Sequence, residues 1–355
     1  MQITLLQLAT AFIYGAAGFS VCLMLLNRFL ILLPDNMGKM PFILTAFTCF
    51  TGGGTLLGLF FHRPAWIFLP IMVLCFIVLG EARRVFIRRL CAGTKPVNTT
   101  PHQINIRKPV TTTDITVHQY KISHPKWTGP RFRIVHLTDL HIHPNLPLEY
   151  YKQVISVAEK TAPDIAVFTG DFVDKLEALP ALREVLRPIA KNGSYAVLGN
   201  HDYWAGADPI RTVIKESGLH LISDESIVLP VLDSEIVITG YDYPWGTKKK
   251  SIPHQKSDRL HLVLSHTPDN IYRIADSSAD FVFSGHYHAG QIRAPILGPI
   301  IIPSVYGRRF DHGHFLVNNT HLFVASGIGA ANPPIRIFCQ PDIFIVDIVP
   351  EARER

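Results

Sequence analysis

The stretch FRIVHLTDLH, residues 132–141, decides the fold, because a short apolar run leads directly into Asp139 and His141. Four later runs end in the same way, at the motifs GD, GNHD, SH and SGHYH. Each run has the length of a buried strand, and β-branched and aromatic residues are frequent in it. Such strands belong to sheets covered on both faces, and layered α/β folds bind their ligands at the carboxyl ends of the strands.

The segments around these runs predict the rest of a layered α/β fold. Apolar periodicity and turn signals predict helices over residues 147–161, 176–190, 209–217 and 268–275. Alternation predicts an edge strand within residues 113–123, a strand pair over 227–232 and 235–239, and final strands over 322–325 and 343–348.

The polar residues at the five strand ends are of the types that bind metal ions. In chain order they are Asp139, His141, Asp171, Asn200, His266, His286 and His288, with His201 and Asp202 directly after Asn200. Carboxylate and amide oxygens suit hard divalent ions, whereas imidazole suits zinc, iron and other transition metals. One carboxylate can bridge two ions about 3.5–4 Å apart. The sequence therefore predicts a site for two divalent ions, with Asp171 as the candidate bridge.

His201 is expected to act beside the ions. Its imidazole could protonate a leaving oxygen or stabilise charge on a phosphate, and Asp202 could orient the ring through a hydrogen bond. Helix N-capping is the alternative role for Asp202. Arg336 is one of four arginines in the C-terminal part that could bind an anionic substrate, although a surface ion pair is the simpler expectation for each.

The ordered motifs resemble those of the calcineurin-like metallophosphoesterases. That family carries D-x-H, G-D, G-N-H-D/E, a single H and G-H-x-H in this order, and all five motifs occur within residues 130–348. The resemblance implies a four-layer αββα fold, two divalent ions of manganese, iron or zinc, and His201 as the catalytic imidazole. It further implies two ligand sets, namely Asp139, His141, Asp171 and His288 for the first ion, and Asp171, Asn200, His266 and His286 for the second.

Two further segments resemble one branch of that family, the bacterial membrane-associated phosphoesterases. SGHYHAGQ, residues 284–291, is similar to S-G-H-T-H-G-G-Q. Residues 326–343 are similar to a closing G-x-G-T, P-x-R and P-E segment, with Ala330 in place of Thr and Asp342 in place of Glu. Members of this branch include enzymes that cleave the pyrophosphate of UDP-2,3-diacylglucosamine and phosphodiesterases. The resemblance thus implies hydrolysis of a phosphodiester or pyrophosphate bond.

The N-terminal quarter is apolar enough for a membrane. Residues 5–26 carry no charge and residues 42–61 form a second apolar run, and each is long enough to span a bilayer. A third run, residues 65–79, has only 15 residues and could be a short span or a re-entrant or interfacial segment. We expect a transmembrane region of two to three helices over residues 1–90, a linker over 91–110 and the metallophosphoesterase domain over 111–350.

The positions of lysine and arginine predict how this region is oriented. One basic group follows the third run and consists of Arg83, Arg84, Arg88, Arg89 and Lys95. The other lies between the first and second runs and consists of Arg28 and Lys39. With three spans both groups lie on one side, which the positive-inside rule makes cytoplasmic. We therefore expect an integral protein of a bacterial inner membrane with a cytoplasmic catalytic domain.

The leading functional hypothesis is an anchored enzyme that acts on a lipid-linked phosphoester such as UDP-2,3-diacylglucosamine, because such a substrate stays in the plane of the bilayer. A general phospholipid or small-molecule phosphodiesterase is the close alternative. A membrane sensor or scaffold with a non-catalytic domain is disfavoured, since no ligand position is substituted. The net charge of +6 suits nucleic-acid binding, but much of it lies beside the membrane, so nucleic acid is not an expected partner.

Overall fold

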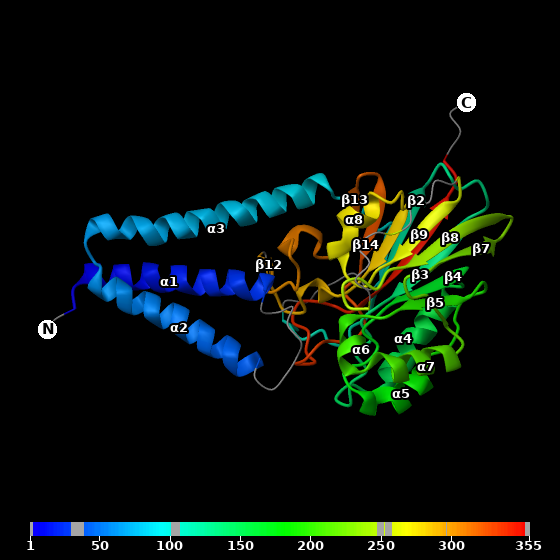
Figure 1. Ribbon diagram of the computed structural model, residues 1–355, viewed down its shortest axis with the longest axis horizontal. Helices are drawn as coiled ribbons and strands as arrows, with labels where there is room; N and C mark the ends of the chain where they lie inside the picture. The colour runs from blue at the N-terminus through cyan, green and yellow to red at the C-terminus, as the bar shows by residue number, and fades with distance from the viewer. Residues whose placement is uncertain are drawn as a thin grey trace. The chain divides into compact units, whose positions relative to one another are not determined.

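The computed structural model describes residues 3–29, 39–100, 107–246, 252, 258–295 and 297–351. The chain divides into two compact units, one made of Met1–Leu90 and Ile301–Arg309, the other of Cys91–Ile300 and Phe310–Arg355. The first unit contains three long helices, α1 (Leu5–Arg28), α2 (Lys39–Phe60) and α3 (Pro64–Leu90) (Figure 1).

Each of these helices is long and apolar enough to cross a membrane, over Leu5–Asn27, Pro41–Phe60 and Ala65–Leu90. The third apolar run is therefore part of a 26-residue candidate span, because α3 continues through the arginines that follow the run. Large apolar side chains are exposed along the helices, with Phe12 77% and Phe76 75% accessible. Such exposure is unfavourable in water and typical of helices solvated by lipid.

Helices α1 and α2 pack closely because glycine lines their contact. A Cβ atom on Gly54 would lie 2.5 Å from the carbonyl oxygen of Tyr14. The Thr10 hydroxyl donates a hydrogen bond of 2.7 Å to the carbonyl of Gly58. Small residues and hydroxyl groups of this kind let two membrane helices approach each other.

The second unit is built on two β-sheets. In spatial order the first sheet consists of β1 (Asn98–Thr100), β2 (Thr116–Ser123), β15 (Asp342–Val349), β3 (Phe132–Leu137), β4 (Ile165–Thr169), β5 (Ser194–Val197) and β6 (His220–Leu221). The second consists of β13 (Gly313–Val317), β14 (Thr320–Val324), β10 (Phe281–Ser284), β9 (Leu260–Leu264), β8 (Ser234–Gly240) and β7 (Ser226–Val231). A small ribbon pairs β11 (Arg293–Ala294) with β12 (Gly298–Pro299).

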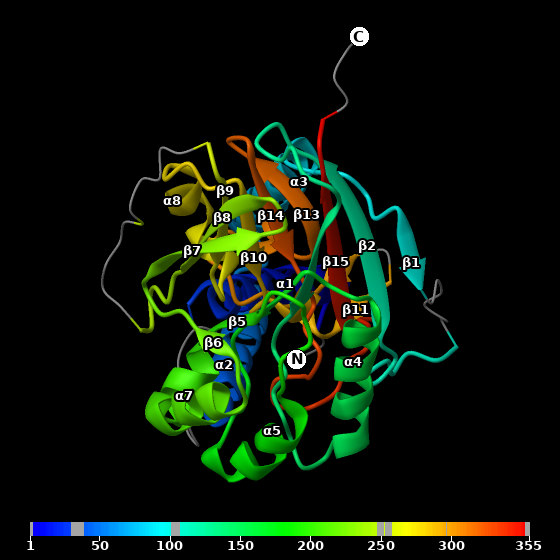
Figure 2. The ribbon, with the colours of Figure 1, turned by 90° about the vertical axis from the view of Figure 1, so that its right-hand side faces the viewer.

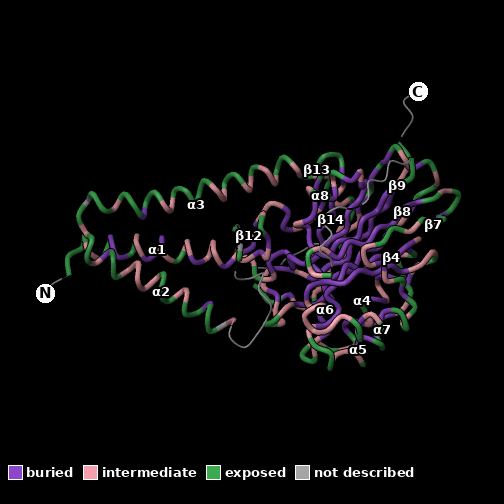
Figure 3. Tube along the Cα trace, viewed as in Figure 1, coloured by how far each residue is buried: buried purple, intermediate pink, exposed green. Residues whose placement is uncertain are grey.

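Helices α4 (Leu148–Lys160), α5 (Leu179–Val185) and α7 (Ala207–Glu216) lie together on the outer face of the first sheet (Figure 2). One apolar core fills the space between these helices and the sheet, and a second fills the space between the two sheets. Successive residues of β4 alternate between them, since Phe168 belongs to the first core and Val167 to the second. Figure 3 shows the strands as the most buried part of this unit.

The short helix α8 (Ile271–Ala275) completes the layers. It connects β9 to β10, which are parallel neighbours. Because the inner face of the second sheet is buried against the first, this crossover helix lies on the outer face. The order of layers is thus helix, sheet, sheet, helix, and the predicted four-layer α/β fold is confirmed.

Five parallel strands bring their carboxyl ends to the same part of this unit. Strands β3, β4 and β5 are neighbours in the first sheet, and β9 and β10 are neighbours in the second. Each of the five predicted motifs lies at the carboxyl end of one of these strands. The sheet topology therefore places the motif loops together.

Two details differ from the sequence prediction. Residues Asn98–Thr100, inside the expected linker, form β1 beside β2, so β2 is not the edge strand. Residues 101–106 of that stretch lie outside the described residues. Helix α5 ends at Val185 rather than near residue 190, because Pro188 restricts the backbone before it and lacks the N–H that a helix requires.

Candidate metal and catalytic site

The loops at the strand ends hold strained backbone conformations. Asp139, His141, Asp171, His286 and His288 have φ angles between 38° and 66°. This is the left-handed region, which residues other than glycine rarely adopt. Such conformations cost on the order of 1–3 kcal/mol each and concentrate at functional sites. The surrounding fold must therefore hold these five residues in place.

Two motif glycines allow the loops to approach one another. A Cβ atom on Gly285 would overlap the carboxylate of Asp139, and one on Gly170 would overlap the backbone nitrogen of Gly199. Gly170 also has a φ of 89°, which favours glycine for a second reason. These contacts explain why the residue before Asp171 and the residue before His286 carry no side chain.

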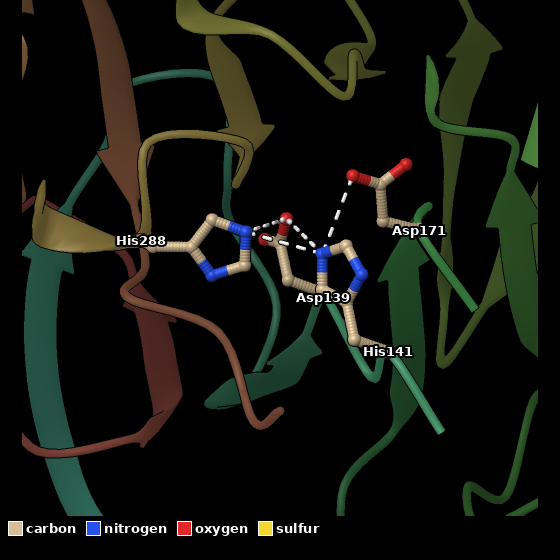
Figure 4. A group of neighbouring side chains, drawn as sticks. All are labelled: Asp139, His141, Asp171 and His288. Carbon is tan, nitrogen blue, oxygen red and sulfur yellow. Dashed lines mark hydrogen bonds and ion pairs between the residues drawn. The ribbon is translucent and has the colours of Figure 1, made fainter. Parts of the chain in front are cut away.

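Asp139, His141, Asp171 and His288 form the first cluster, and all four are buried (Figure 4). The Nε2 atom of His141 lies 3.1 Å from Nε2 of His288 and 3.5 Å from Oδ2 of Asp171. The Nε2 atom of His288 lies 3.4 Å from Oδ1 of Asp139. Ligand atoms from the ends of β3, β4 and β10 thus converge on one point, as a bound cation requires.

Asp171, His266 and His286 form a second cluster, with Asn200 beside it. The Nε2 atom of His266 lies 3.1 Å from Oδ2 of Asp171 and 3.0 Å from Oδ1 of Asn200. The Nε2 atom of His286 is buried without a hydrogen-bond partner among the described residues. A buried polar atom without a partner is unfavourable, so this donor set fits a metal ion. Asp171 belongs to both clusters.

Hydrogen bonds fix the imidazoles from behind. The Nδ1 atom of His141 lies 2.6 Å from Oδ1 of Asp174, and that of His266 lies 2.6 Å from the carbonyl oxygen of Thr169. These bonds leave Nε2 of each ring directed into its cluster, as the outer partners of metal ligands do. Burial lowers the pKa of His141, but the nearby carboxylates, Asp174 foremost, raise it to about 10.

Opposite charges also surround the shared carboxylate. Burial raises the pKa of Asp171, but His266, His201 and His141 together hold it well below its usual range. The carboxylate is therefore ionised and available to a cation.

His201 lies beside both clusters in helix α6 (Asn200–Ala205). Its Nδ1 atom is 2.7 Å from Oδ1 of Asp174, and its ring centroid is 4.7 Å from that of His141. The backbone N–H of His201 donates a 2.8 Å hydrogen bond to Oδ1 of Asp171. One ring nitrogen is thus held by Asp174, and Nε2 is the atom that remains for a substrate.

The structure favours the alternative role of Asp202, helix capping, over the orientation of His201, because its carboxylate accepts the N–H of Gly199, the N-cap residue of α6. The carboxylate of Asp202 accepts hydrogen bonds of 2.9–3.3 Å from the backbone N–H groups of residues 171–173 and Gly199. His201 and Asp202 are adjacent in a helix, and adjacent helical side chains do not face each other. Asp174 therefore supplies the carboxylate beside His201, while Asp202 fixes the loop that carries Asp171. Burial, and then the charge of Asp171, raises the pKa of Asp202 to about 7.

The role of Asp174 was not predicted, although a signal was present. Asp174 follows Asp171 by three residues in the same loop, GDFVD, which is close enough for both carboxylates to serve one site. Burial raises the pKa of Asp174, but His141 and His201 lower it by more, so that the pKa lies well below the usual range.

Arg336 is neither in a surface ion pair nor available to a substrate, which corrects both sequence expectations. It is fully buried. Its guanidinium donates hydrogen bonds to carbonyl oxygens within residues 326–329 and lies 3.4 Å from Nδ1 of His288. Arg336 therefore fixes the loop of residues 326–329 behind His288, a candidate metal ligand.

Two tryptophans that the sequence analysis did not single out border the clusters. The ring of Trp204 lies 5.0 Å from that of His201, and the ring of Trp245 lies 5.2 Å from that of His286. Both indoles are half-buried. They give the site flat apolar surfaces beside its charged residues.

Comparison with known proteins identifies the family. The sequence model of the calcineurin-like phosphoesterases matches residues 132–290. The metallophosphoesterase YkuE of Bacillus subtilis is 30% identical over 264 residues, which cover 69% of this chain and 85% of YkuE. The chain belongs to the calcineurin-like phosphoesterase family. It is therefore a hydrolase of phosphoester bonds, as the motifs predicted.

Two further relatives have named activities. Phosphodiesterase YaeI of Escherichia coli is 26% identical over 237 residues, covering 65% of this chain and 87% of YaeI. The UDP-2,3-diacylglucosamine pyrophosphatase LpxG of Chlamydia muridarum is 24% identical over 233 residues, covering 49% of this chain and 71% of LpxG. Both names describe hydrolysis at phosphorus, which agrees with the enzyme class.

Proposed function

We propose that this protein is a membrane-anchored phosphoesterase with two divalent metal ions. The first ion would be held by Asp139, His141, Asp171 and His288, and the second by Asp171, Asn200, His266 and His286. The observation that carries the proposal is the pair of buried clusters that share Asp171. Manganese, iron or zinc would suit this mixture of carboxylate, amide and imidazole donors.

The residues of the chain have separate tasks in the proposed reaction. Bound ions would lower the pKa of water and neutralise charge on the phosphate oxygens. Asp174 holds Nδ1 of His201, so that Nε2 can carry a proton to the leaving oxygen. Asp202 holds the loop of Asp171 through backbone hydrogen bonds, which keeps the shared carboxylate at a fixed distance from His201.

Several features support an amphiphilic substrate. The three apolar helices would keep the enzyme in the same plane as a lipid-linked phosphoester, which raises the effective concentration of substrate. Trp204 and Trp245 offer surfaces for a nucleobase or an apolar group. The named substrate of LpxG combines a nucleobase, a phosphate linkage and a lipid portion. We therefore propose UDP-2,3-diacylglucosamine or a similar molecule.

A general phospholipid or small-molecule phosphodiesterase is the second candidate. The similarity to YaeI, a phosphodiesterase, favours it. The two candidates share the metal site and differ in what the surrounding surfaces recognise.

The basic residues at the end of α3 support a cytoplasmic catalytic domain in a bacterial inner membrane. Arg88 and Arg89 lie in the last turn of this helix, and such residues remain on the cytoplasmic side. We propose a membrane region over residues 1–90, a linker over 91–110 and the catalytic domain over 111–350. A reporter fused to the C-terminus should show cytoplasmic behaviour, and export of the reporter would contradict this orientation.

The substrate proposal is tested with the full-length protein in detergent, supplied with Mn²⁺. The substrates are UDP-2,3-diacylglucosamine, a panel of phospholipids and bis-p-nitrophenyl phosphate, and the Asp171→Asn variant controls for contaminating hydrolases. We expect the highest kcat/KM for the nucleotide-linked lipid. Comparable turnover of all substrates would favour the general phosphodiesterase. Hydrolysis that does not depend on Asp171 would contradict the metal-site proposal.

Removal of the anchor separates membrane binding from chemistry. A shortened protein that starts near Pro109 retains every candidate metal ligand. It should keep most of its rate on the soluble diester and lose rate on substrate embedded in a bilayer. Equal rates on the bilayer substrate with and without the helices would refute the proposed role of the anchor.

A further inference from the structure

A second group of metal-binding side chains lies outside the phosphoesterase clusters. His118 on β2, Asp342 at the start of β15 and His312 directly before β13 bring three ligand atoms within 4.8 Å of one another. The Nε2 atom of His312 lies 2.5 Å from Oδ2 of Asp342, and the Nε2 atom of His118 lies 3.8 Å from the same oxygen. Two imidazoles thus converge on one carboxylate oxygen.

Hydrogen bonds hold the parts of this group that point away from its centre. The Thr99 hydroxyl pairs with Nδ1 of His118 at 3.1 Å. The Ser326 N–H donates a 2.8 Å hydrogen bond to Oδ1 of Asp342. These contacts leave Nε2 of His118 and Oδ2 of Asp342 directed at each other. Outer hydrogen bonds of this kind orient metal ligands.

The hydrogen bond with Thr99 and edge-to-face packing on Phe344 hold the ring of His118, but its Nε2 atom makes no hydrogen bond to Asp342. Its distance of 3.8 Å from Asp342 is too long for a hydrogen bond, so the ring points at a carboxylate that it does not bond. A tetrahedral zinc ion, with ligands at about 2.0–2.2 Å, places its ligand atoms about 3.3–3.6 Å apart. The two observed separations, 2.5 Å and 3.8 Å, lie on either side of that range. Small side-chain movements would therefore suffice to complete the geometry.

The group is also accessible to an ion. The side chains of His118 and His312 are 17% and 28% exposed, whereas Asp342 is buried. An ion can enter from solvent, and water can take a fourth position. Two imidazoles and one carboxylate are a donor set that zinc accepts.

We propose that His118, His312 and Asp342 bind one Zn²⁺ ion at a site separate from the phosphoesterase centre. The ligands come from both sheets, since β2 and β15 belong to the first and β13 is an edge strand of the second. The ion would tie the two sheets together at this edge. Because the unfolded chain does not hold the three ligands together, zinc would stabilise the folded state.

The test counts zinc in the full-length protein, which is equilibrated with Zn²⁺ in detergent, freed of unbound metal and analysed by mass spectrometry. Wild type should hold one zinc ion per chain more than the double variant His118→Gln/His312→Gln. The control His220→Gln removes an exposed histidine of β6 and should hold as much zinc as wild type. Equal zinc in wild type and the double variant would overturn the proposal and leave a hydrogen-bonded group only.

The variant Thr99→Val keeps all three ligands and removes only the outer hydrogen bond to His118, so it also serves if the double variant fails to fold. Loss of an outer partner typically lowers metal affinity about 10–100-fold, and we expect a loss in this range for the additional ion. Zinc should also raise the Tm of wild type more than that of Thr99→Val. Unchanged zinc affinity together with an unchanged Tm response would contradict the proposal.

Discussion

The middle and the end of the strands in the catalytic unit bury opposite kinds of surface. Phe281, in strand β10, lies in the apolar core between the sheets. Five residues further on, His286 lies in a buried cluster with Asp171 and has a left-handed backbone conformation. The strand middles therefore contribute stability, whereas the strand ends hold charge and strain of the kind that concentrates at functional sites. Changes at the two places should separate activity from stability.

The largest effect on activity is expected from Asp171→Asn. The substitution keeps the shape of the side chain but removes the negative charge that both clusters share. We expect kcat on the soluble diester to fall by orders of magnitude, with a lower metal content. Tm is compared without added metal, because bound ions stabilise the folded state. Activity close to that of wild type, with fewer than one ion per chain, would refute the two-metal assignment.

A smaller loss is expected from His201→Ala. The imidazole belongs to neither of the two proposed ligand sets, so metal content should stay nearly constant while kcat falls about 10²–10⁴-fold, the usual contribution of general acid–base catalysis. Elemental analysis and steady-state kinetics on one preparation check both parts. Loss of both ions from this variant would show that His201 is a ligand.

Asp174→Asn tests the carboxylate that lies beside His201. The variant leaves the imidazole in place but removes the carboxylate that holds Nδ1 of both His201 and the proposed ligand His141, so metal content is measured on the same preparation. We expect a smaller fall in kcat than for His201→Ala, with a shifted pH–rate profile. A pH–rate profile and kcat identical to those of wild type would leave the contact between Asp174 and His201 without a catalytic role.

Phe281→Ala tests the strand middle and should affect stability rather than chemistry. Phe281 is fully buried and stacks on His321 and Phe323. Phe-to-Ala substitutions in cores lower the free energy of unfolding by about 3–5 kcal/mol. The Tm should therefore fall, while kcat on the soluble diester, measured well below the new Tm, should stay near the wild-type value. A large fall in kcat would show that core and site are not separable.

The sequence predicts those parts of the fold that carry a local signal and misses those that depend on contacts between distant segments. Strands β3, β4, β5, β9 and β10 carry a local signal, an apolar run followed by a ligand type, and all five form. The parallel pairing of β2 with β15 joins segments far apart in the chain, which no local pattern reveals. Helix α6 has six residues, too few for helical periodicity to be recognised.

The site shows a similar limit. Motifs identified the residue types that converge, and the assignment of each to an ion stays a prediction. They could not show which carboxylate faces His201, because Asp202 is its sequence neighbour while Asp174 reaches it only through the folded loop. Arg336 was misjudged for the same reason, since the carbonyl groups that bind it gather only in the folded chain.

His136 is an exception to the apolar strand middles and leads to the smallest predicted effect. It is fully buried in β3, its Nε2 atom lies 2.8 Å from the Thr169 hydroxyl, and its Nδ1 atom has no hydrogen-bond partner among the described residues. Burial lowers the pKa of His136 to about 3, although the charge of Asp342 opposes the shift. The ring is therefore neutral in the folded protein at any pH near neutrality.

This pKa predicts how stability depends on pH. The unfolded chain takes up a proton at His136 near its ordinary pKa of about 6.5, whereas the folded chain does not until the pH approaches the lowered value. Between these values the unfolded state binds more protons, so stability falls as the pH drops, by at most about 1.4 kcal/mol per pH unit from this group. Thermal unfolding followed by tryptophan fluorescence, at neutral pH and one to two units below it, should show wild type losing more stability than His136→Gln. An equal loss would mean that the folded protein accepts a proton at His136, and the strand middle would then tolerate charge as its end does.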